Sequence, residues 1–384
     1  MKKAILGFVL VLVSLSSLPA ASHYGLTANG FEPSAINMAL GGSPVGVVNF
    51  WHNDPLNAYD NPAFPALKRG LSLSNNRYIY MKPGADSNFD DLEYSAALSS
   101  VSYYGFGLLF PYINHETHET GSYVDYGTLS FTDETAFEGI TIQAHDRAKT
   151  YGLSMNLPRI YKLFKADASL LPYNADLALG VNLIHNSSYI FPEPDVGRVK
   201  AKSANLGLLA RMDHIQDGGL HLESAYGVSY FNAFGSTVNY IKGRQSSTIY
   251  QRLNLGMSLS CALENSAYPA DEGIASIVEN LGTARLLAGV IDEFADDPLI
   301  LGFGGELGLG DTVFMRMGYY DDSAGKISGL SYGLGINLHY RDLISAVYNY
   351  SHFPGGNINK NKIANSFSFS VDLLGIINTI NSSR

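Results

Sequence analysis

Cysteine is nearly absent from this chain, because Cys261 is the only one in 384 residues. A single cysteine cannot form an intramolecular disulfide, so a small, disulfide-stapled secreted domain is excluded. Charged residues are also scarce, at 16%, and acids outnumber bases by 35 to 25, which gives a net charge of -10. An acidic chain is a poor partner for nucleic acid, so nucleic-acid binding is not expected.

Long apolar runs are absent after the N-terminus, so membrane-spanning helices are not expected in the body of the chain. At the N-terminus, Lys2 and Lys3 precede a short apolar stretch at 4–15, and small residues follow at 20–22. This pattern is typical of a secretory signal peptide, and we predict that residues 1–22 are cleaved. A membrane anchor is the weaker alternative, because a spanning helix needs about 18 apolar residues or more.

Alternation of apolar and polar residues dominates what remains. In 298–310, Leu301 and Phe303 fall on one face, and Gly304 and Glu306 fall on the other. Such alternation predicts a β-strand with one apolar and one polar face. Many alternating segments run to roughly 10–14 residues, whereas soluble strands average about 5–6 and tilted membrane strands need about 9–11.

These lengths favour an all-β fold, a transmembrane antiparallel β-barrel of about 14 strands, within a range of roughly 12–16. Glycine and serine on the polar faces suit a crowded barrel interior, and Cys261 falls on an apolar face, turned to lipid or to packing neighbours. The predicted strands are 71–81, 92–100, 103–112, 123–132, 149–158, 173–186, 201–213, 219–232, 248–262, 298–309, 312–320, 329–340, 343–352 and 364–375, with 139–146 as a further candidate.

One segment, 271–296, departs from the period of two. Ile274, Ile277, Val278 and Leu281 follow helical spacing, as do apolar residues later in the segment. We predict a small helical insert of two short amphipathic helices between strands. Two interpretations stay open: a loop folded against the barrel mouth, and an element that docks on the membrane surface or on a partner.

The segment 37–64 is neither strand nor helix, and it is rich in residues that form turns. Gly41 and Gly42 permit positive φ angles and close approach of the backbone. Asn61 precedes Pro62, and this order suits a fixed corner because proline restricts its predecessor and asparagine can bond its own backbone. A segment built this way is suited to a compact, rigid structure.

The same segment resembles the N-terminal signature of the FadL and PorV families of outer-membrane barrels. The closing part of the chain, from 304 to 373, is similar to the last strands of the PorV type. The resemblance implies an N-terminal plug at 23–66, a barrel at 67–376 and a C-terminal tail at 377–384. The residues that carry the N-terminal likeness are Leu40, Gly41, Gly42, Val45, Asp54, Asn57, Ala58, Tyr59, Asn61, Pro62 and Ala63.

The resemblance also implies a function. A FadL-type barrel in the bacterial outer membrane would bind or pass small hydrophobic molecules, with membrane lipid as its surroundings. The alternative is a PorV-like accessory barrel of a type IX-like protein secretion system, and a structural or adhesive role also stays open. The residues expected to bind ligand or gate the plug, unless they only shape it, are Gly41, Gly42, Asp54, Asn61, Pro62 and Ala63.

Candidate chemical sites elsewhere are weak. His115 and His118 in 114–120 have metal-ligand spacing, but the sequence positions no third ligand. The acidic stretches 86–91 and 321–323 lack a complete calcium-loop pattern. We therefore expect no metal, no cofactor and no enzymatic activity.

Overall fold

The computed structural model describes most of the chain. The signal peptide predicted at 1–22 and the stretches at 86–91 and 114–120 lie outside the described residues. Those described are 24–25, 32–81, 92–112, 121–130, 141–164, 175–189, 198–217, 219–241, 245–249, 251–264, 280–294, 298–323, 327–340, 343–355 and 362–382.

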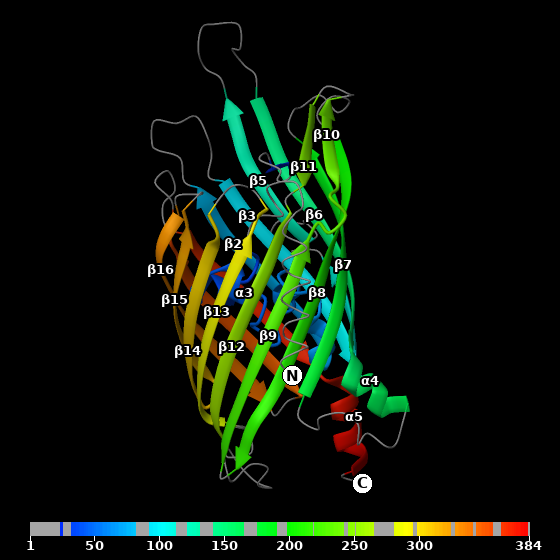
Figure 1. The fold of residues 1–384 in the computed structure, drawn as a ribbon, viewed down its shortest axis with the longest axis vertical. Coiled ribbons are helices and arrows are strands. Elements are labelled where there is room, and N and C mark those ends of the chain that lie inside the picture. The colour runs from blue at the N-terminus through cyan, green and yellow to red at the C-terminus, as the bar shows by residue number, and fades with distance from the viewer. Residues whose placement is uncertain are drawn as a thin grey trace, which may run out of the picture.

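A single closed sheet of antiparallel strands forms the wall of a barrel (Figure 1). The ladder between its first strand and its second closes the ring. The wall strands are β2 (Gly70–Met81), β3 (Leu92–Tyr103), β4 (Phe106–Pro111), β5 (Gly121–Ser130), β6 (Thr141–Asn156), β7 (Ala175–Tyr189), β8 (Arg198–Asp217), β9 (Leu220–Phe231), β12 (Arg252–Glu264), β13 (Asn280–Asp292), β14 (Ile300–Leu309), β15 (Val313–Asp322), β16 (Ile327–Tyr340), β17 (Ile344–Phe353) and β18 (Lys362–Val371).

One position in the wall is shared by two short strands. Both β4 and β5 lie between β3 and β6, β4 against one half of each neighbour and β5 against the other. The 15 strands therefore fill 14 positions, and the prediction of a closed antiparallel barrel of about 14 strands is confirmed.

Two errors cancel in that predicted count. The segments 103–112 and 123–132 were expected as separate wall strands, yet they share one position as β4 and β5. The helical insert predicted at 271–296 is wrong, because 280–292 is the strand β13, paired with β12 and β14. Residues 271–279 lie outside the described part.

The reason for the second error is that apolar residues occur on both faces of β13. Leu286 points outward and is 66% exposed, whereas Leu287 and Ile291 point inward and are buried. Their inward neighbours are protein rather than water, since β13 contacts a helix that lies inside the barrel. Alternation is lost wherever the inner face of a strand packs on such a core.

Two predicted boundaries also change. Of the further candidate 139–146, the described residues 141–146 are the first part of β6, continuous with the strand predicted at 149–158. The last strand ends at Val371 instead of 375, because Asp372 accepts a hydrogen bond from the Gly375 N–H at 2.9 Å and so caps a helix. That helix, α5 (Leu373–Ser382), occupies most of the predicted tail.

The two ends of the barrel differ. Tight turns join β3 to β4, β8 to β9 and β14 to β15 at one end, which we call the short-turn end. In the first of them, Tyr104 and Gly105 both have positive φ, the geometry of a type I′ hairpin. The opposite end, the loop end, carries a small separate sheet of β1 (Tyr24–Gly25), β10 (Thr237–Ile241) and β11 (Gln245–Ile249).

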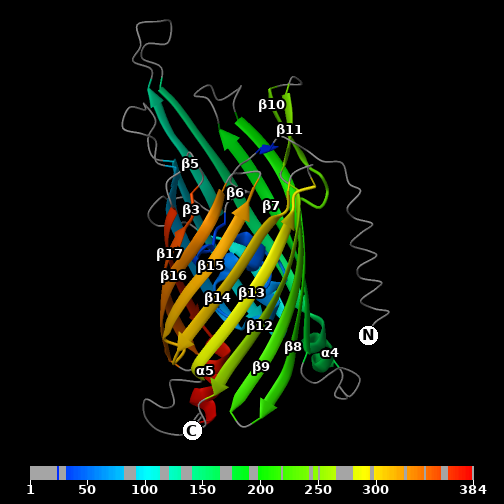
Figure 2. The same ribbon diagram turned by 60° about the vertical axis from the view of Figure 1, so that its left-hand side comes forward.

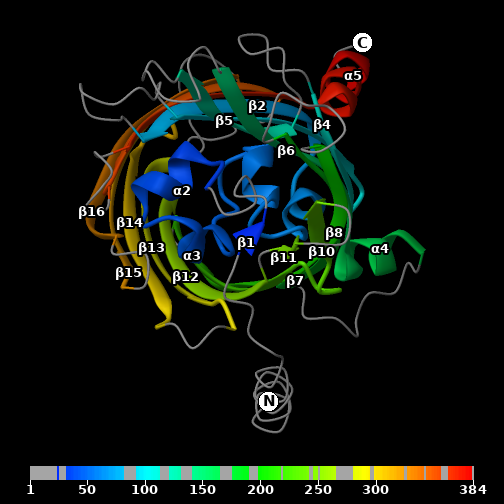
Figure 3. The ribbon, with the colours of Figure 1, turned by 90° about the horizontal axis from the view of Figure 1, so that it is seen from above.

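Inside the ring lies the segment 32–69, which we call the plug. Figure 3 shows its helices enclosed by strands, whereas α4 (Leu157–Phe164) and α5 lie outside the ring. Among the described residues, no helix is long and apolar enough to cross a membrane. The plug helices are α2 (Ala35–Ala39), α3 (Ser43–Gly46), η2 (Pro55–Ala58) and η3 (Phe64–Leu67).

Outward positions along the wall are apolar, as the alternation predicts. On β16, Tyr332, Leu334 and Leu338 are about half exposed or more, at 47%, 54% and 68%. Ser331 and Gly333, on the same strand, are buried and face the plug. The strands of the wall, which Figure 2 shows from a second side, thus have an apolar outer face and a polar or small-residue inner face.

Candidate functional site: a chamber above the plug

Short helices with side-chain caps build the plug. The Ser34 hydroxyl accepts a hydrogen bond from the Asn37 N–H at the start of α2. Asp54 does the same for η2 by accepting from the Leu56 N–H at 3.0 Å. Prolines stand in the first turns of α3, η2 and η3, where a missing N–H costs nothing. Caps and prolines explain why this turn-rich sequence folds compactly.

A buried polar network centres on Asn37. Its Nδ2 donates to Asp60 Oδ2 at 2.9 Å and to Glu32 Oε1 at 3.3 Å. Its Oδ1 accepts from Asn49 Nδ2 at 2.7 Å. One amide thus joins residues from the start, middle and end of the plug. Buried polar groups are stable only when they are paired in this way.

The corner predicted at Asn61-Pro62-Ala63 is tied to the wall. Asn61 Nδ2 donates to the carbonyl oxygens of Val47 at 2.9 Å and of Leu208, on β8, at 3.1 Å. Its Oδ1 accepts from the Ala63 N–H at 3.0 Å. A role for the corner in ligand binding or gating stays a prediction.

The other three predicted site residues lie elsewhere in the plug. Gly41 and Gly42 have φ angles of 107° and 80°. A Cβ on Gly41 would lie 2.8 Å from the carbonyl oxygens of Phe303 and Tyr319, so the plug touches the wall there. Asp54 caps η2, and burial raises the pKa of its carboxyl.

Glycines on the inner face of the wall receive the plug backbone. Across four neighbouring strands, Gly227 pairs with Gly256, Gly256 with Gly289, and Gly289 with Gly302. A Cβ on Gly289 would overlap the carbonyl of Pro44. The inner glycines that alternation places on these strands are therefore the seat of the plug.

Near the short-turn end, His52 of the plug meets charged wall residues. Its Nε2 lies 2.6 Å from Glu306 Oε2, and Arg316 Nε donates to the same oxygen at 2.6 Å. Arg285 forms a second ion pair with Glu306. Burial lowers the pKa of His52 to about 4, and the two arginines add to this effect. His52 is thus neutral at pH 7 and ties the plug to β14.

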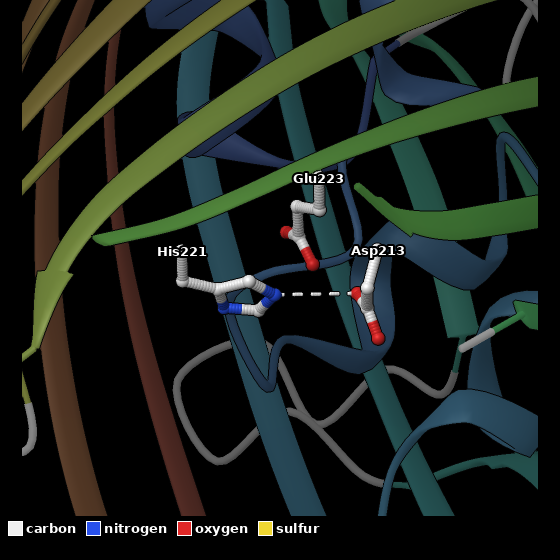
Figure 4. A group of neighbouring side chains, drawn as sticks. All are labelled: Asp213, His221 and Glu223. Carbon is white, nitrogen blue, oxygen red and sulfur yellow. Dashed lines mark hydrogen bonds and ion pairs between the residues drawn. The ribbon is translucent and has the colours of Figure 1, made fainter. Parts of the chain in front are cut away.

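A second cluster at this end, shown in Figure 4, contains Asp213, His221 and Glu223. Their side chains could in principle hold a metal ion, since His221 Nε2 lies 3.3 Å from Asp213 Oδ1. However, Arg211 lies 3.4 Å from Asp213 and 3.5 Å from Glu223. The arginine already supplies the positive charge, and Trp51 Nε1 donates to Glu223. The cluster is best described as an ion-pair network that holds the plug.

Toward the loop end, a chamber of about 170 Å³ lies between the plug and the wall. Plug residues and strands from both halves of the barrel contribute to its lining. The lining residues are Glu32, Met38, Ser43, Tyr78, Arg252, Ile291, Glu293, Ile300, Tyr320, Asp322, Ile327, Phe353 and Lys362. This mixture of apolar walls and a few charged groups is typical of small-molecule sites.

Sequence reasoning did not select these chamber residues. Of the predicted site, only Gly42 borders it, since a Cβ there would lie 3.0 Å from the Tyr320 ring and 3.2 Å from the Phe353 ring. One signal was available: Arg252 is a charged residue on the polar, inward face of an alternating strand. Asp322, from the weak calcium candidate 321–323, lines the chamber from the end of β15.

Two wider grooves lie on the outer face of the barrel. Outward apolar residues line them, and both include Gly305, Leu286 and Met317. Cys261 lines one of them, in agreement with its predicted position on an apolar face. Because they are open on the apolar outer surface, these grooves suit lipid chains better than a selective ligand.

No protein-family model matches the chain, and no curated protein matches it either. Solved outer-membrane structures resemble it in shape. The toluene transporter TodX of Pseudomonas putida is 8% identical, with a TM-score of 0.45 over 89% of this chain and 98% of that one. The toluene transporter TbuX of Ralstonia pickettii is 9% identical, with a TM-score of 0.41 over 89% and 99%. A FadL homologue of Pseudomonas aeruginosa is 13% identical, with a TM-score of 0.36 over 92% and 100%.

At these identities and scores, the likenesses assign neither a family nor a ligand to this chain. None of the three is a PorV barrel, and the PorV part of the sequence resemblance stays a prediction.

Proposed function

We propose that this chain is a FadL-type barrel of the bacterial outer membrane, exported by a cleaved signal peptide. In this proposal it is not an enzyme. It binds small, largely apolar molecules in the chamber and passes them across the membrane.

The outer surface supports the location. Large apolar side chains cover it, including Met257, Leu286 and Leu338 at 58%, 66% and 68% exposure. Soluble proteins rarely expose apolar surface on this scale. Closure of the sheet also gives every wall strand a partner on both sides along most of its length, which is the condition for β-structure to span lipid.

The chamber is the observation that carries the transport proposal. Its volume of about 170 Å³ is close to that of an engineered apolar cavity of about 150 Å³ that binds benzene. Ile291, Ile300 and Phe353 give it apolar walls. A molecule with one ring fits such a space, whereas a folded peptide segment does not.

The plug limits how a molecule can leave the chamber. Its backbone lies directly on the inner glycines of β9, β12, β13 and β14, which closes that side, and Pro65 also lies against Gly107 of β4. On the opposite side the wall position of β4 and β5 is interrupted. Among the described residues, 149–151 of β6 have no ladder partner on that side. We propose that molecules leave the barrel sideways at this interruption.

Uptake into liposomes tests the proposal. Protein reconstituted in vesicles that contain a toluene-responsive dye should accelerate toluene entry. Ile300→Trp, which fills the chamber, should abolish the acceleration. Leu301→Trp is the matched control, because the next side chain along β14 points outward to lipid. Equal uptake by both variants would rule out the chamber as the binding site.

The secretion role is the second candidate, and one feature favours it. The helix α5 exposes Leu373, Ile377 and Ile380, at 53%, 51% and 50%, on one face at the short-turn end. An apolar stripe of this kind suits docking to another protein. Deletion of the gene should then reduce the amount of exported surface protein. An unchanged set of exported proteins would remove this candidate.

A further inference from the structure

The chamber is not neutral. Three carboxyl groups line it, those of Glu32, Glu293 and Asp322, against the two cationic side chains of Arg252 and Lys362. A further acid, Asp60, lies directly behind Glu32, since both accept from the same Asn37 amide. Acids therefore outnumber bases in and around a small chamber.

The charge of Arg252 is turned toward the plug. Its Nη2 lies 3.3 Å from Asp60 Oδ1, and its guanidinium stacks on the ring of Phe231 at 3.9 Å. Both side chains of the ion pair are at most 2% exposed. The guanidinium that lines the chamber is thus already neutralised by an acid outside the lining, and it offers little attraction to a ligand anion.

Glu32 is the charged residue that the plug contributes to the chamber lining. Its Oε1 accepts from the Ser34 N–H at 2.8 Å and from Asn37 Nδ2 at 3.3 Å, and its carboxyl group lies beside Asp60 and Ser43. Burial, with Asp60 beside it, raises the pKa of Glu32 well above its ordinary value. A positive charge in the chamber would relieve both the burial and the repulsion.

Aromatic rings complete the lining. Tyr78, Tyr320 and Phe353 all contribute, and the Tyr320 and Phe353 rings lie 4.9 Å apart between centroids. Rings attract cations through their faces when little water intervenes. They also stabilise a ligand ring by stacking. Carboxyl groups and rings together form a lining that suits an organic cation with an apolar body.

We propose that the chamber selects small molecules that combine an aromatic or aliphatic body with one positive charge, as in a primary ammonium, over carboxylates of the same size. This inference rests on the proposed function, because it names the ligand class of the same chamber. The ammonium lies near Glu32, and the apolar body lies among Ile291, Ile300 and Phe353.

Three probes of one size separate the alternatives: benzylamine, benzoate and toluene. Calorimetric titration of the full-length mature protein in detergent at pH 7 should show benzylamine binding at least about tenfold more tightly than benzoate, or about 1.4 kcal/mol. Glu32→Gln should reduce this ratio to below about threefold. The matched control is Glu264→Gln, at the end of β12 opposite Arg252 and the chamber. This variant should leave the ratio of the two affinities unchanged.

A second variant keeps the inference testable if the Glu32→Gln variant does not fold. Lys362→Met removes a positive charge from the wall side of the chamber, so it should increase the preference for benzylamine. Benzoate binding as tightly as benzylamine overturns the inference, and so does a preference that Lys362→Met leaves unchanged. Equal binding of all three probes also overturns it but leaves the proposed function intact. Binding of none of them refutes the proposed function itself.

Discussion

Arg252 of β12 and Asp60 of the plug form a fully buried ion pair, with 3.3 Å between Nη2 and Oδ1. The pair joins two parts of the chain that are 192 residues apart. Charges buried so deeply are tolerated only in pairs, because removal of one partner leaves the other unpaired in a medium of low dielectric. The position of the plug and the stability of the barrel are therefore coupled through this contact.

Asp60→Asn should destabilise the protein by about 3–5 kcal/mol, because it leaves the Arg252 guanidinium buried without a counter-charge. Urea unfolding in detergent would measure the change. The matched control is Glu93→Gln, which breaks the ion pair with Arg77 on the surface, where the partners are 33% and 44% exposed. That pair should contribute no more than about 1 kcal/mol. Equal effects of the two variants would contradict the structural role of the buried pair.

Gly289→Ala should displace the plug, because the added methyl group would overlap the Pro44 carbonyl. Overpacking of this kind typically costs about 1–3 kcal/mol. Limited proteolysis should cut the variant within the plug faster than the wild type. Gly305→Ala is the control, since its Cβ would find only ordinary contacts at 3.6 Å on the outer face. Equal protection of both variants would show that the plug does not rest on the inner glycines.

Acid should weaken the protein through His52. Its pKa is about 4 in the folded protein and about 6.5 when unfolded, so the unfolded chain binds a proton first as the pH falls. Stability from the neutral imidazole is complete above pH 6.5 and is lost between pH 6.5 and 4, by up to roughly 3 kcal/mol.

The test compares urea midpoints at pH 7 and pH 5 for the wild type and for His52→Gln. The variant should lose less stability across this interval, because glutamine does not titrate. A variant with the same pH dependence as the wild type would show that other groups control acid stability.

Asn61→Ala should cost about 2–4 kcal/mol, because the carbonyls of Val47 and Leu208 and the Ala63 N–H lose their partner. Measuring both the stability and the toluene uptake of this variant distinguishes a structural role of Asn61 from a role in gating. Loss of stability with normal toluene uptake per folded protein would mean that the residue only shapes the plug. Altered uptake at unchanged stability would instead support the predicted role in ligand binding or gating.

The sequence pattern predicted the strands of the barrel wall more directly than it predicted the plug and the chamber inside. Where one face of a strand meets the apolar outside and the other meets glycine and serine, as in β14 and β16, the period of two is visible and the prediction is correct. It failed for β13, because Leu287 packs on the plug and Ile291 faces the chamber, so apolar residues occupy both faces of the strand and the period is lost.

Only the tertiary structure decided where the chamber lies and which charges surround it. Glu32, Arg252 and Lys362 are far apart in the sequence, and no local pattern relates them. They meet because closure of the ring brings β18 beside β2, and because the plug lies within it. Periodicity is a local property that follows from backbone geometry, whereas a site inside a closed barrel depends on distant segments meeting across the lumen.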